Sequence, residues 1–240
     1  TCALPICQLH LYQARLAQGM AERGYPPEFA AALCRQIEGF GSYGFPESHA
    51  ASFALLVYVS AWIKRFHPAA FLCALLNSQP MGFYSPSQLI QDARRHGVAV
   101  LPADVCTSDG DSILEAPRGA PQPAVRLGLE RIKGVGPDTA RRIAAARDQA
   151  PFASVDDLTR RARLDTADLR ALAAGGAFAR LAGHRRQALW AAAGSPPAPG
   201  LLRDAVVVDP PPPLPAPSEA QDLVADYARL GFTLGSHPLT

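Results

Sequence analysis

The sequence predicts a mainly α-helical chain, in which two helical parts are separated by a small β element. Apolar residues recur at three- and four-residue spacing through residues 10–97 and again through residues 129–193, which is the helical period. Between these parts, short apolar runs are bounded by proline and glycine, as strands often are. Nine prolines lie between residues 196 and 217, four of them consecutive, and they predict an extended linker instead of a packed core.

In the first part, residues 10–38 read as helices interrupted at Gly24-Tyr25-Pro26-Pro27. A glycine-aromatic loop is predicted at residues 39–46. A long helix follows from about His49 to Phe66, with Ser48 as its N-cap. This helix is apolar nearly all round, so we expect most of it to be buried. Two shorter helices are predicted after it, at residues 69–77 and 85–97.

The β element is predicted to hold two strands, Val98–Leu101 and Ala124–Leu127, with a turn at Asp109–Asp111 and a Pro/Gly loop at residues 116–123. The second part then reads as further helices. Their predicted ranges are 138–148, 154–162, 166–175, 185–193 and 218–227.

Charge and cysteine content narrow the class of protein. The net charge is only +2, yet residues 125–190 hold 13 Lys/Arg against 7 Asp/Glu, as expected for a segment that contacts a polyanion. The five cysteines, an odd number with no CxxC pair, indicate reduced and mostly buried thiols in a cytoplasmic protein. No signal peptide is seen, and the longest apolar run, residues 50–63, is too short to span a bilayer.

The most informative run is LERIKGVGPDTARRI at residues 129–143. Gly134 and Gly136 can adopt positive φ and let a phosphate approach without a Cβ in the way. Pro137 suits the first position of a helix, whose free N–H groups and dipole attract anions. This pattern matches the helix-hairpin-helix consensus, and an ordinary helical turn with a glycine cap is the alternative. The predicted DNA-binding residues are Lys133, Gly134, Val135, Gly136, Thr139, Arg141 and Arg142.

A second hairpin is predicted around Leu164-Asp165-Thr166. It lacks the paired glycines, so we expect it to serve packing more than phosphate contact. The sequence Gly175-Gly176-Ala177-Phe178 after it predicts a helix C-terminal turn with Phe178 packed back onto the hairpin pair.

No catalytic constellation is evident. Ser48 and His49 lie at a helix start, but no nucleophile elbow or orienting acid accompanies them. Asp109 and Asp111 form a DxD pair of the kind that binds Mg²⁺, yet a Gly/Ser turn favours a solvated pair. We therefore predict neither catalytic residues nor a metal site in this chain.

Several strings resemble the bacterial C-family DNA polymerases, the alpha subunits of polymerase III. YGFPESHAASFA at residues 43–54 and LNSQPMGFYSP at residues 76–86 are most similar to the error-prone branch, which copies past lesions in the DNA-damage response. The resemblance continues in order through Leu127–Gly136, Gly183–Arg186 and Leu234–Leu239. It covers about residues 10–240, whereas the first eight residues do not fit it.

The resemblance implies a fragment of a DNA-directed DNA polymerase used in translesion synthesis. Residues 10–95 would belong to the fingers, with Ser48 and His49 near the incoming deoxynucleotide or template. Residues 125–190 would form a tandem helix-hairpin-helix module that grips duplex DNA without sequence specificity. The palm and its Mg²⁺-binding aspartates would lie upstream, so this chain alone should lack polymerase activity. Translesion or sliding-clamp proteins are further partners to expect.

The predicted domains are a fingers segment (1–97), a β element (98–124), the hairpin module (125–194), a linker (195–217) and the start of a further domain (218–240). Two other functional classes stay open on the sequence alone. One is a non-enzymatic helix-hairpin-helix scaffold in DNA binding or repair, and the other is an interaction module that uses the Pro-rich linker as a ligand.

Overall fold

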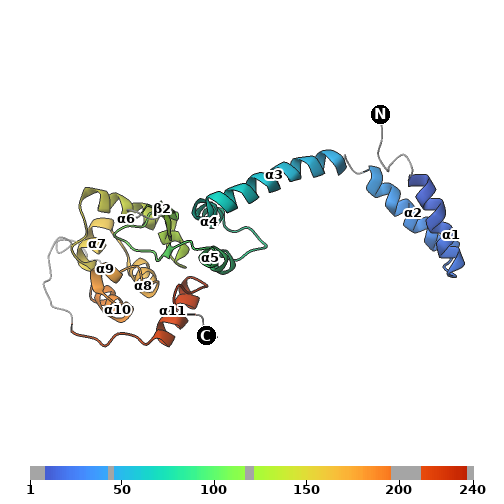
Figure 1. Ribbon diagram of the computed structural model, residues 1–240. Coiled ribbons are helices and arrows are strands. Elements are labelled where there is room, and N and C mark those ends of the chain that lie inside the picture. The colour runs from blue at the N-terminus through green and yellow to red at the C-terminus, as the bar shows by residue number, and fades with distance from the viewer. Residues whose placement is uncertain (1–8, 43–45, 117–121, 196–211, 237–240) are drawn as a thin grey trace. The chain divides into compact units, whose positions relative to one another are not determined.

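The computed structural model describes residues 9–42, 46–116, 122–195 and 212–236, and for residues 9–12, 37–42 and 46–49 it describes only the backbone. The fold is mainly helical with one small sheet (Figure 1), which confirms the predicted fold class. The chain divides into two compact units, Thr1–Ala61 and Trp62–Thr240, and each is described by itself.

The first unit contains the helices α1 (Leu9–Glu22) and α2 (Pro27–Ser42), which pack against each other. The predicted break between them is confirmed, with Gly24 at φ 77°. The predicted loop at residues 39–46 is wrong as far as Ser42, because α2 continues through Gly39 and Gly41. A glycine costs a helix only about 1 kcal/mol, which continued backbone hydrogen bonding can offset. Residues 43–45 lie outside the described part of the chain.

Helix α3 (Pro46–Phe66) begins earlier than predicted, with proline at its first position. Ser48 therefore lies within the first turn and is not the N-cap. The predicted burial of this helix is also wrong, since Leu55 is 65% exposed and Tyr58 is 70% exposed. An apolar composition shows that a helix can be buried, but burial needs a covering surface, and the described residues provide none over the middle of α3.

The second unit begins within the last turns of α3 and continues with α4 (Pro68–Asn77) and α5 (Pro86–Arg95), both near their predicted positions. Ser85 and Gln88 form a capping box at the start of α5. The sheet has the order β1-β3-β2. Its outer strand β1 (Val100–Leu101) runs parallel to β3 (Ala124–Arg126), and both strands were predicted.

Strand β2 (Ile113–Glu115) was not predicted, and it pairs antiparallel with β3, Leu114 opposite Val125. Three residues are too few to show an alternating pattern. The strand is held by a tertiary ion pair, in which Arg126 Nε lies 2.7 Å from Glu115 Oε1. Hydrogen bonding to this guanidinium lowers the pKa of the Glu115 carboxyl. The predicted Pro/Gly loop beyond β2 falls largely on residues 117–121, outside the description.

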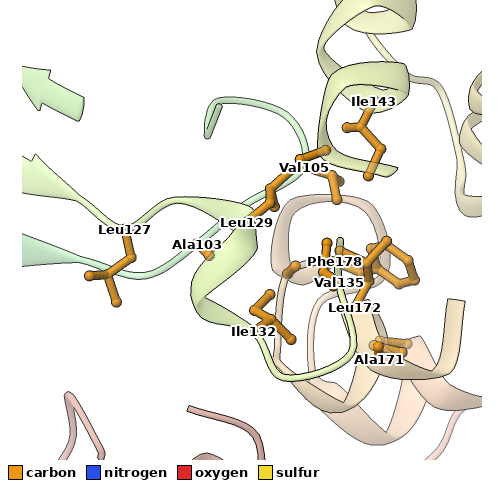
Figure 2. Close-up of a cluster of buried hydrophobic side chains, with 14 of the residues drawn as sticks. Ala103, Val105, Leu127, Leu129, Ile132, Val135, Ile143, Ala171, Leu172 and Phe178 are labelled. Carbon is orange, nitrogen blue, oxygen red and sulfur yellow. The ribbon is translucent and has the colours of Figure 1, made fainter. Parts of the chain in front are cut away.

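The rest of the unit is helical and shares one hydrophobic core with α4 and the sheet (Figure 2). Phe178 is fully buried in this core, which confirms the prediction that it packs back onto the hairpin pair. A short 3₁₀ helix, Leu129–Arg131, opens this region. The helices that follow are α6 (Pro137–Gln149), α7 (Val155–Ala162), α8 (Thr166–Ala174), α9 (Ala179–Ala182), α10 (Arg185–Gly194) and α11 (Glu219–Arg229).

The described cysteines are free thiols, as predicted, but only Cys73 is fully buried, while Cys34 and Cys106 are partly buried. Burial raises the pKa of the Cys106 thiol to about 11. Cys2 and Cys7 lie outside the described residues. None of the helices in the described ranges has both the length and the apolar character that crossing a membrane requires.

Candidate nucleic-acid interface

The first hairpin is a tight turn between the 3₁₀ helix and α6. Gly134 has φ +100°, a left-handed conformation that a side chain would strain, and the Val135 amide closes the turn by donating to Ile132 O at 3.0 Å. Gly136 has φ −90° and ψ 166°, so the expectation of positive φ holds for Gly134 and is wrong for Gly136. Gly136 is instead the extended N-cap of α6, and its carbonyl accepts from Ala140 N at 3.1 Å.

The start of α6 is open to an anion. Gly136 has no side chain to cap the helix, and a Cβ built on it would meet nothing within 4 Å. Within the described residues, no acceptor bonds the amides of Gly134, Gly136 or Asp138. Unpaired amides at the positive end of a helix dipole form an anion-binding site. The turn therefore offers main-chain donors to a phosphate without steric obstruction.

Not every amide of the turn is available to a ligand. The Lys133 amide donates to Arg229 O of α11 at 2.8 Å, while the Lys133 side chain is exposed. Val135 is buried, and Figure 2 shows it in the same cluster as Leu172, Phe178 and Ile143. Val135 thus anchors the turn to the core and leaves contact with a ligand to its neighbours.

The two predicted arginines of α6 lie on different faces of the helix. Arg141 is on the surface, where its side chain is 75% exposed and pairs with Asp138. Arg142 instead donates to Asp168 Oδ2 at 3.0 Å and to Thr139 Oγ1 at 3.2 Å. Thr139 is buried and donates to Asp168 Oδ1 at 2.9 Å.

The predicted site residues therefore separate into two groups. Those that face outward at the start of α6 are Lys133, Gly134, Gly136 and Arg141. Those tied to the rest of the protein are Val135 and Thr139, which are buried, and Arg142, whose side chain is 41% exposed but paired with Asp168; they hold the first hairpin to the core and to the second hairpin. Of Ser48 and His49 the structure describes only the backbone, in the first turn of α3, so their predicted role stays a prediction.

The second hairpin, α7 and α8, is present with a different turn. Arg163 takes the left-handed conformation, φ 52°, where the first hairpin has Gly134 at φ +100°. Asp165 caps α8, accepting from Asp168 N at 2.7 Å, and the Asp168 carboxylate accepts from Asp165 N at 3.4 Å. Two carboxylates thus occupy the end of α8 that corresponds to the open end of α6. This occupied turn supports the expectation that the second hairpin serves packing.

The loop around the predicted turn at Asp109–Asp111 braces the entrance to the first hairpin, a role that the sequence did not indicate. Asp109 O accepts from Leu129 N at 2.9 Å, and Gly110 O accepts from Glu130 N at 3.1 Å. Arg147 of α6 lies 2.5 Å from the Asp109 carboxylate, and the Asp109 side chain remains 49% exposed, so the predicted solvated turn is ion-paired at Asp109 as well. Ser112 also holds this loop, because its hydroxyl accepts from Gly128 N at 3.3 Å.

The described residues include no group of three or more His, Cys, Asp or Glu side chains that could hold a metal ion. The expectation that Mg²⁺ is bound by aspartates upstream of this chain stays a prediction.

Comparison with known proteins agrees with this geometry. Residues 97–188 match the sequence model of a helix-hairpin-helix motif. The chain is 66% identical over 235 residues to the error-prone DNA polymerase of Aromatoleum aromaticum, a match that covers 97% of this chain and 22% of that protein. Identity to the error-prone DNA polymerases of Dechloromonas aromatica and Burkholderia pseudomallei is 59% and 58%, over 97% and 95% of this chain. The chain spans about a fifth of the length of these relatives, and the resemblance seen in the sequence is confirmed.

Proposed function

We propose that this chain is the part of an error-prone DNA polymerase that holds duplex DNA by its sugar–phosphate backbone. One observation carries the proposal, namely the uncapped start of α6, where the amides of Gly134, Gly136 and Asp138 lack acceptors among the described residues. Main-chain amides recognise phosphate but not base sequence, so such binding positions DNA without reading it. Lys133 and Arg141 add positive charge beside these amides.

The two hairpins play different parts in this proposal. A phosphate approaching α8 would meet the carboxylates of Asp165 and Asp168, which repel it and already accept the available amides. A phosphate approaching α6 meets no such carboxylate at the N-cap. Asp138 does lie in the first turn of α6, but its charge is paired with Arg141. The first hairpin is thus the DNA contact, and the second is its support.

The polymerase activity belongs to the longer protein. There, deoxynucleotides would be added to a primer end with Mg²⁺ supplied from residues outside this chain, and Ser48 and His49 would lie near the nucleotide or template. Translesion or sliding-clamp proteins are proposed as further partners, and the cytoplasm as the location. A non-enzymatic hairpin scaffold is disfavoured, because the similarity to error-prone polymerases covers 95% or more of the chain, well beyond residues 97–188.

The substitution Gly136→Asp tests the phosphate site directly. It would give α6 the carboxylate cap that α8 already has, and, because glycine is itself a tolerated N-cap, the new cap would stabilise the helix by only about a few tenths of a kcal/mol. The same carboxylate would occupy the amides and repel phosphate. We expect a folded protein with an unchanged or raised melting temperature, and about tenfold or greater loss of affinity for a fluorescent duplex in anisotropy titrations.

The matched control is Gly136→Asn, which caps the helix without adding charge. It should lose less affinity than Gly136→Asp, and the difference measures the electrostatic part. Wild-type affinity in a folded Gly136→Asp variant would refute the assignment of DNA binding to this turn.

A further inference from the structure

The C-terminal segment, residues 212–236, reaches back to the first hairpin. The last carbonyls of a helix lack partners within the helix, and Arg229 O at the end of α11 finds one in the Lys133 amide, at 2.8 Å. This hydrogen bond lies directly beside Gly134, the residue of the turn with positive φ. We refer to residues 212–236 as the strap.

A buried arginine fastens the strap to the hairpin module. The Arg185 side chain, on α10, is only 13% exposed and lies between two carboxylates of α11. Its Nη1 lies 2.5 Å from Asp222 Oδ1 and its Nη2 lies 2.5 Å from Asp226 Oδ1. A planar guanidinium can reach both carboxylates at once, which a lysine ammonium cannot do with the same geometry.

Further contacts hold the strap along its length. Before α11, His184 Nε2 lies 3.0 Å from Leu214 O, and Arg186 donates to Pro215 O at 2.8 Å. After α11, Phe232 is 3% exposed and belongs to the same core as the hairpins. Figure 1 shows α11 near α8, in accord with their contact. The strap is therefore part of the folded unit, and its position relative to the turn is fixed.

We propose that the strap positions the first hairpin for DNA, with Arg185 as the positioning residue that keeps Arg229 O on the Lys133 amide. This inference rests on the proposed function for its DNA readout. When the backbone amide of Lys133 is bonded to the strap, the next free amides, those of Gly134 and Gly136, are directed away from the core. A turn that is already ordered loses less conformational freedom on binding, and it binds more tightly for that reason.

The test uses the 240-residue chain and the variant Arg185→Lys, which keeps the charge but loses the two-pronged contact. The first readout is residue-resolved amide hydrogen exchange without DNA. The Lys133 amide should exchange at least tenfold faster than in the wild type, while the Ile143 amide in the core of α6 should not change. The second readout is duplex affinity by anisotropy, which should weaken by about three- to tenfold.

The outcomes separate the strap from the proposed function. Unchanged exchange at Lys133 would overturn the role of Arg185, and faster exchange with equal or tighter DNA binding would overturn the positioning of the hairpin. If the wild-type chain did not bind duplex at all, the proposed function would fail, while the exchange result would still report on the strap. Should Arg185→Lys not fold, Asp226→Asn, which removes one carboxylate and leaves Asp222 in place, takes its place with the same expectations.

Discussion

Two glycines, one before the 3₁₀ helix of the first hairpin and one before α6, are required for opposite reasons. Gly128 lies where two backbone segments meet, and a Cβ on it would stand 2.2 Å from Gly110 O. Gly136 lies in open space, with nothing within 4 Å of the same atom. The first glycine lets the chain pack against the bracing loop, and the second lets a ligand approach the helix.

The contrast predicts that Gly128→Ala and Gly136→Ala differ in stability. Gly128→Ala should lower the free energy of unfolding by about 1–3 kcal/mol, the usual range for overpacking, because neither backbone segment can move without breaking hydrogen bonds. Gly136→Ala should change it by less than about 0.5 kcal/mol. Urea denaturation followed by circular dichroism measures both. Equal stability of the two variants would contradict the close approach at Gly128.

At the scale of elements, α6 presents one face to solvent and one to the second hairpin. Consecutive arginines on a helix point about 100° apart, so the doublet Arg141-Arg142 is divided between these faces. Asp168 belongs to the capping box of α8, and its carboxylate also receives Arg142 and Thr139. One carboxylate thus completes the cap of α8 and ties the two hairpins together.

This division predicts separate effects for the two arginines. Arg142→Ala should destabilise the chain by about 1–2 kcal/mol, since it leaves the buried Asp168 carboxylate without its charged partner. Arg141→Ala should leave stability within about 0.5 kcal/mol, because exposed ion pairs contribute little, but it should weaken duplex binding. Thermal denaturation and anisotropy titration on both variants test the pair. A stability loss for Arg141→Ala as large as that for Arg142→Ala would contradict the assignment of the two arginines to different faces of α6.

For the molecule as a whole, the elements that depend on local sequence patterns could be predicted from the sequence. The helices around Pro86 and Pro137 follow from proline at the first helical position and from apolar periodicity. The misplaced features depend on contacts distant in sequence. Strand β2 exists because Arg126 and β3 hold it, and the exposure of α3 depends on what covers the helix, which a single helix cannot reveal.

The candidate site shows the same limit. The spacing of Gly134 and Gly136 located the turn, because the turn is a local structure. It could not distinguish Arg141 from Arg142 or show that Thr139 is buried, since both depend on Asp168 in another helix. The hydrogen bond from Lys133 N to Arg229 O could not be predicted for the same reason, because a long Pro-rich segment separates α11 from the hairpins in the sequence.

The electrostatics of the whole molecule make a final prediction about salt. Much of the positive charge of residues 125–190 is neutralised within the protein, by pairs such as Arg147 with Asp109 and Arg161 with Asp157. The cations still available to release counterions from DNA are those without an acidic partner among the described residues, such as Lys133, and those in largely exposed pairs, such as Arg141. A plot of log K against log salt should therefore have a slope of about −2 to −4, at about −0.9 per phosphate neutralised, and not the larger value that 13 cations would suggest.

Two duplexes of unrelated sequence should give the same slope and affinities within about twofold, because phosphate contacts carry no sequence information. A slope steeper than about −6, or a strong preference for one duplex, would show that the arginines of the less exposed pairs, such as Arg147 and Arg161, or base contacts take part, and the hairpin turn would not be the main contact.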